Sequence, residues 1–221
     1  MHKFAPTLIA GALLGACALA QAATVAEVFN GEMLGTNQRY FESVAGIPRE
    51  SFGDEHTFRV QGCNITATVG GGNVYKLRME LTPQCQADLT QFVGDYAPAP
   101  DQPLTFGAFE QSSGGGLGYS ADCLSGCGNG YDPSVYGHWQ GPRAVEFVEV
   151  LLEAAQVGDQ AIAAAATWRE QMIQAKGEDW VMDGGFNCDD QFDSVARQAL
   201  QNVQITAVTI GQEVRQNSCQ E

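Results

Sequence analysis

Residues 55–81 show the clearest alternation of apolar and polar positions in the chain. Apolar side chains recur at Cys63, Ile65, Ala67 and Val69, and threonines and an asparagine stand between them. A second alternating run follows, in which Tyr75, Leu77, Met79 and Leu81 are expected to face inward. This pattern predicts two antiparallel strands with one solvated face. The sequence GGGN at 70–73 predicts the turn, since glycine and asparagine accept positive φ. Phe58 and Val60 indicate a further strand just before the pair.

A short helix is predicted before these strands, in TNQRYFESVAGIP at 36–48. Thr36 is expected to cap it, and the residues after the cap form an apolar stripe that contains Tyr40, Phe41, Val44 and Ala45. Gly46 suits the C-terminal position and Pro48 blocks continuation.

This helix and the strands from HTFRV (56–60) to RMEL (78–81) together resemble one module of the β-lactamase-inhibitor-protein or outer-membrane-assembly-lipoprotein type. The resemblance covers residues 36–81, about a quarter of the chain. It implies a short helical segment packed on a small antiparallel sheet. The resemblance is one of architecture, and architecture alone carries no function.

The composition of residues 95–118 predicts a linker. DYAPAPDQP at 95–103 is rich in proline, and QSSGGGLG at 111–118 is rich in glycine and serine. TFGAF, at 105–109, is expected to form a short strand between them. A boundary near 96–103 would divide the chain into an N-terminal module at 24–96 and a C-terminal module at 104–221.

The C-terminal module is predicted to mix strands and helices. VYGHWQGPRAVEFVEVLLEA, at 135–154, fits either a hairpin that turns at 140–143 or a helix that begins at Pro142, and its valines favour strands. A helix is expected over 159–176, with Asp159 as cap and Gly177 as terminator. Another helix, capped by Asp189 or Asp190, and a final strand at 203–211 complete the module. The predicted fold class is therefore α+β, an antiparallel sheet with helices packed on one side and disulfides as reinforcement.

The first 23 residues have the pattern of a secretory signal peptide. Lys3 gives a basic start, an apolar run follows from Leu8 to Ala20, and Ala20-Gln21-Ala22 matches a small-x-small cleavage site. We therefore expect a periplasmic or secreted protein. Leu14-Gly15-Ala16-Cys17 also resembles a weak lipobox, so a lipid anchor at Cys17 is the less favoured alternative. No other apolar stretch is long enough to span a bilayer.

An oxidising compartment favours disulfides among the remaining six cysteines. Six cysteines allow fifteen pairings. Their places along the predicted strands suggest Cys63 with Cys85 and Cys123 with Cys127, which leaves Cys188 with Cys219. In CLSGCGNG, at 123–130, a disulfide is favoured over a metal or redox site. A zinc site needs four ligands, and a thioredoxin-type motif has two residues between its cysteines, not three.

The net charge of −15 limits the partners of this chain. No basic stripe is visible, so binding to nucleic acid or to an anionic membrane is disfavoured. A basic protein partner fits better. Tyr131, Tyr136, His138 and Trp139 are expected to be exposed, and such aromatic side chains are typical anchors at interfaces.

Candidate chemistry is sparse. A group of carboxylate and amide side chains at 183–193 could hold calcium, but it lacks the EF-hand pattern, and helix capping explains it. His138 is the one plausible catalytic imidazole, and no G-x-S-x-G, H-E-x-x-H or phosphate loop is present. We therefore predict no catalytic residue and no cofactor. The favoured function is a binding or inhibitor-type protein that acts through its surface, ahead of an envelope assembly lipoprotein and a hydrolase with an unrecognised carboxylate site.

Overall fold

A computed structural model describes residues 22–99, 102–128, 132–141 and 148–214. The predicted signal peptide, with Cys17, lies outside these residues except for its last two alanines. No helix in the described ranges is long and apolar enough to cross a membrane.

The strands of the described residues form one eight-stranded antiparallel sheet, in the order β1-β2-β3-β4-β8-β7-β6-β5. Its strands are β1 (Glu50–Phe52), β2 (Glu55–Val60), β3 (Cys63–Gly70), β4 (Asn73–Glu80), β5 (Gly118–Ala121), β6 (Ser134–Trp139), β7 (Glu149–Ala155) and β8 (Ala207–Gly211). Strand β8 lies between β4 and β7, so it joins the early strands to the late ones.

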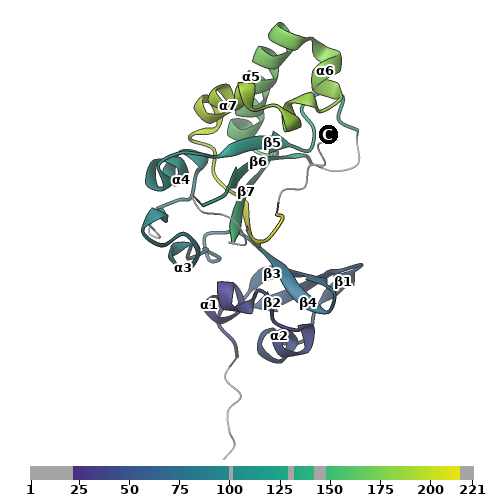
Figure 1. Cartoon of the computed structure of the whole chain (residues 1–221), viewed down its shortest axis with the longest axis vertical. Helices are drawn as coiled ribbons and strands as arrows, with labels where there is room; N and C mark the ends of the chain where they lie inside the picture. Colours follow the sequence, from purple (N-terminus) through teal and green to yellow (C-terminus); the bar gives the residue numbers. More distant parts are fainter. Residues whose placement is uncertain (1–21, 100–101, 129–131, 142–147, 215–221) are drawn as a thin grey trace, which may run out of the picture.

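Helices lie at both ends of this sheet. Figure 1 shows α1 and α2 beside β1–β4, and α5, α6 and α7 beside β5–β7. The helices are α1 (Val25–Val28), α2 (Gln38–Ala45), α3 (Thr90–Val93), α4 (Phe106–Ser113), α5 (Asp159–Lys176), α6 (Glu178–Met182) and α7 (Asp193–Leu200), with short 3-10 turns η1 (Gly31–Met33), η2 (Gly94–Tyr96), η3 (Gly185–Cys188) and η4 (Asp190–Phe192). The predicted α+β class with an antiparallel sheet is confirmed.

One face of the sheet carries the apolar core across both ends. Leu77 on β4 pairs with Ile210 on β8, which pairs with Val150 on β7, and all three are fully buried. The core continues from Phe41 and Phe58 at one end to Phe106 and Trp168 at the other. Burial of this continuous surface is the main stabilising term of the fold.

The opposite face is polar and carries a clamp between the early and late strands. The Arg78 guanidinium on β4 donates to both carboxylate oxygens of Glu153 on β7, at 2.9 and 3.0 Å. Ser134 on β6 donates to the same carboxylate. Two parallel hydrogen bonds between charged groups fix geometry better than a single contact.

The β3–β4 hairpin is confirmed, with one correction. Gly71 and Gly72 both have positive φ at the turn. The register shifts between Thr68 and Val69, so Tyr75 is the extra residue of a β-bulge. Val74 is buried in its place, and Tyr75 is only partly buried.

Two predictions for helices and caps are wrong in detail. Asn37, not Thr36, caps α2, because its side chain accepts from the backbone N–H of Tyr40. TFGAF is not a strand but the start of α4, where Thr105 caps the N-terminus and Gly114 is the left-handed C-cap. Phe106, Phe109 and Glu110 then fall on one buried face, as helical spacing requires.

The ambiguous segment after Pro133 forms strands where it is described. Trp139 pairs with Val150, so the connection is longer than the predicted turn at 140–143, and most of it lies outside the described residues. Helix α5 covers 159–176 as predicted and ends at Gly177, although Gly158 is its N-cap. The proposed division near 96–103 stays a prediction, and strands from both predicted modules share the sheet.

Candidate functional site

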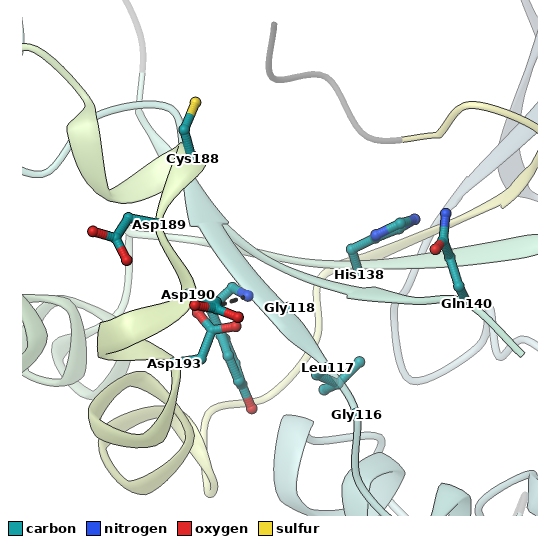
Figure 2. A pocket seen from close by; sticks show the side chains of 10 residues that line it. Gly116, Leu117, Gly118, His138, Gln140, Cys188, Asp189, Asp190 and Asp193 are labelled. Carbon is teal, nitrogen blue, oxygen red and sulfur yellow. Dashed lines mark hydrogen bonds between the residues drawn. The ribbon is translucent and has the colours of Figure 1, made fainter. Parts of the chain in front are cut away.

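A hollow of about 750 Å³ lies beside the outer strand β5 (Figure 2). We call it the β5 hollow. Figure 2 shows its aspartates on one side and His138 with Gln140 on the other. Its lining residues are Gly116, Leu117, Gly118, Tyr119, His138, Gln140, Cys188, Asp189, Asp190 and Asp193.

The aspartates of the hollow come from the turns between α6 and α7. Asp189 caps η4 by accepting from the backbone N–H of Gln191 at 3.0 Å. Asp193 begins α7, where a carboxylate is favoured by the helix dipole. Short-range capping therefore explains why acidic residues occur here, and the same turns direct several carboxylates to one hollow.

Side chains of this segment also close the outer edge of β5. Asn187 accepts from the backbone N–H of Ala121 and donates to its carbonyl, both at 3.0 Å. Asp193 accepts from the N–H of Tyr119 at 3.3 Å. An amide that pairs with both groups of one residue imitates a neighbouring strand, so the outer edge of β5 is protected at these two residues.

His138 stands across the hollow from the aspartates. Its side chain is buried, with 9% of the residue exposed, and Nε2 lies 3.0 Å from a carboxylate oxygen of Glu149 on β7. Glu149 also accepts from the Gln140 amide and from the Val214 N–H. Partial burial opposes ionisation, but these hydrogen bonds outweigh it, so the pKa of Glu149 lies below its usual value.

Tyr119 lines the hollow, and its hydroxyl stays protonated. Burial is the largest cause that raises the pKa of its hydroxyl far above the usual value, and the nearby Glu110 carboxylate adds to it. The hydroxyl donates to Glu110 at 3.3 Å, and Arg197 binds the same carboxylate at 2.6 Å. The hydrogen bond and the ion pair of Glu110 thus connect α4, β5 and α7 next to the hollow.

The side chains that line the hollow are suited to accept hydrogen bonds rather than to catalyse a reaction. In the part of the chain that the structure describes, no serine, threonine, lysine or arginine lines it. Among the described residues, no group of three or more histidines, cysteines, aspartates and glutamates could hold a metal ion. Carboxylates in an open hollow favour ligands with positive charge and several donors, such as lysine and arginine side chains.

The structure corrects the predicted aromatic surface. Tyr136 is 8% exposed and Trp139 is 7% exposed, because β6 is buried along its whole length between β5 and β7. Trp139 packs edge-on against Phe109 in the core. The expected exposure of these two residues, and of His138, which is 9% exposed, is therefore wrong. Tyr131 lies outside the described residues, and His138 reaches the hollow. Whether these residues contact a partner stays a prediction.

Two of the suggested disulfides are present. Cys63 pairs with Cys85 and Cys123 with Cys127, with Cα–Cα distances of 5.5 and 5.7 Å. Cys188 is also disulfide-bonded, whereas Cys219 lies outside the described residues. The first bridge closes the β3–β4 hairpin, and a loop of this length stabilises the fold by roughly 3 kcal/mol in the chain-entropy model.

Sequence reasoning missed the Asn187 bridge and the Glu110–Arg197 pair. Asn187 lies 66 residues from Ala121, and no local pattern signals contacts at that separation. The only local signal in the sequence is the acidic cluster at 183–193, and helix capping also explains that cluster.

Comparisons with known proteins found no relative of this chain. No protein-family model, curated protein or solved structure matches this chain.

Proposed function

We propose that this chain is an exported, disulfide-stabilised binding protein and that its β5 hollow receives basic side chains of a protein partner. The observation that carries the proposal is the charge of the hollow. Asp189, Asp190 and Asp193 line it together, and no lysine or arginine is among its described lining residues.

The distribution of charge along the chain supports the same surface. Residues 97–221 hold seventeen acidic and five basic side chains, against nine and five in residues 24–96. The part of the chain that supplies the hollow, residues 97–221, therefore carries most of the negative charge. Such a field raises the rate of encounter with a basic partner, and salt weakens it.

The test is affinity capture from cell-envelope extract with the exported, oxidised protein as bait. Asp190→Asn is the informative variant, because this carboxylate lines the hollow, is exposed and makes no hydrogen bond in the described structure. We expect one basic protein to be retained at low salt, to be released at moderate salt and to be weakened several-fold by Asp190→Asn.

Glu170→Gln is the matched control, since Glu170 is exposed on α5 and its replacement removes the same charge. If Asp190→Asn and Glu170→Gln retain the protein equally, the hollow is not the binding site. If no basic protein is retained by a folded bait, the proposal fails.

A hydrolase is the second candidate, because buried His138 faces the hollow and is held by Glu149. A histidine oriented by a carboxylate can act as a general base. His138→Gln should then abolish turnover of a substrate found by screening, whereas surface binding predicts that capture survives this change.

A further inference from the structure

The outer strand β1 exposes apolar side chains to solvent. Ile47 and Phe52 are each 88% exposed. Among the described strands, β1 ends the sheet order and pairs only with β2. No hydrogen bond of the described structure ties the outer side of β1 to a neighbour, in contrast to the outer side of β5.

Two arginines lie close to Ile47. A hollow of about 430 Å³ is lined by Ala45, Gly46, Ile47, Pro48, Arg49 and Arg59. Within the described residues, neither Arg49 nor Arg59 forms an ion pair, and Arg59 donates only to the neutral amide of Asn64. Arg78 and Arg197, by contrast, each bind a glutamate.

Unpaired guanidinium groups in a chain of net charge −15 favour an anionic ligand. An arginine binds a carboxylate with two hydrogen bonds when no internal carboxylate competes. The exposed Ile47, which lines the same hollow, and Phe52 further along β1 favour a ligand that also carries apolar groups.

We propose that this surface, the β1 edge (residues 47–52 with Arg59), binds an extended segment of a partner protein in which apolar side chains alternate with carboxylates. Such a segment pairs its main chain with β1, covers Ile47 or Phe52 with an apolar side chain and presents a carboxylate to Arg49 or Arg59.

A continuous anionic surface fits this edge less well than a short segment does. Glu50 lies on β1, and Glu55 on β2 stands opposite Phe52. Both are exposed and would repel a membrane or a polyphosphate, whereas a segment with spaced carboxylates avoids them. The proposal does not rest on the β5 hollow, which has the opposite charge and lies at the other edge of the sheet.

The test is a titration of the exported, oxidised protein with the peptide acetyl-Val-Glu-Val-Glu-Val-amide, followed by backbone amide NMR. We expect shifts centred on residues 49–53 at millimolar peptide. The variant Arg49→Gln/Arg59→Gln should weaken binding about tenfold, because it removes both guanidinium groups.

Two controls keep the result specific. The peptide with lysine in place of glutamate should bind at least about tenfold more weakly. The variant Lys76→Gln/Lys176→Gln removes two positive charges elsewhere and should bind the acidic peptide normally. The proposal is overturned by equal binding of the two peptides, by an unchanged affinity of the arginine variant, or by no binding at millimolar peptide. Arginine-dependent binding to phosphatidylglycerol vesicles without peptide binding would also overturn it.

Discussion

The two outer strands of the sheet end it in different ways. At β5, the side chains of Asn187 and Asp193 occupy the outward backbone groups, and a polar hollow lies beyond. At β1, three exposed residues end the sheet, Ile47 and Phe52 are exposed, and Ile47 lines a hollow with two arginines. A free edge invites pairing with another chain. Pairing with another chain is therefore prevented at the β5 edge of this sheet and left open at the β1 edge.

The largest effect is expected when the protection of β5 is removed. Asn187→Ala leaves the N–H and the carbonyl of Ala121 without their partner, and Ala121 is fully buried. Each orphaned group costs about 1–3 kcal/mol, so we expect the free energy of unfolding to fall by about 3 kcal/mol. Urea denaturation of the oxidised protein measures this loss.

Asn64→Ala is the control, since Asn64 binds only the side chains of Arg59 and Glu80 on the polar face. Its expected cost is within about 0.5 kcal/mol. Similar losses for the two variants would show that the β5 edge does not depend on Asn187.

The two ends of the sheet should also respond differently to pH, because Glu149 lies at the β5 end. The folded state binds the ionised carboxylate through His138, Gln140 and Val214, and this lowers the pKa. The site therefore stabilises the fold above the ordinary glutamate pKa of about 4.3, and this stabilisation is lost as pH falls through the lower folded pKa.

Hydrogen exchange of β6 and β7 amides, compared between the wild-type protein and Glu149→Gln, measures this effect. The excess protection of the wild type should shrink as pH falls into that range, while amides of β2 and β3 respond alike in both proteins. A constant difference across the range would exclude a titrating role for Glu149.

The smallest expected effect comes from Phe52→Ser on β1. A side chain that is 88% exposed loses little on replacement, so stability should stay within about 0.5 kcal/mol. Phe58→Ala on the adjacent strand is the contrast, because Phe58 is buried against Phe41 and its loss costs about 3–5 kcal/mol. Thermal denaturation compares the two. A large loss for Phe52→Ser would mean that β1 is part of the core.

Local patterns predicted the elements better than the site. Alternation and glycines identified the β3–β4 hairpin, and Gly177 identified the end of α5, because each signal lies within a few residues. The bulge at Tyr75 was invisible, since it depends on the register between two strands. Segment 105–109 was misassigned although Thr105 and Gly114 are ordinary helix caps. The partners His138 and Glu149 required the pairing of β6 with β7, which follows a connection of unpredictable length.

The place of β8 has a consequence for the order of assembly. Every other described strand precedes it in the chain, yet it occupies the gap between β4 and β7. Until residues 207–211 have been synthesised, neither β4 nor β7 has a partner on that side. Arg78 and Glu153 then have no strand between them that fixes the distance across which they pair. Among the described strands, the one that completes the centre of the sheet is therefore the last to be made, and a nascent chain that lacks residues 207–211 cannot complete the sheet.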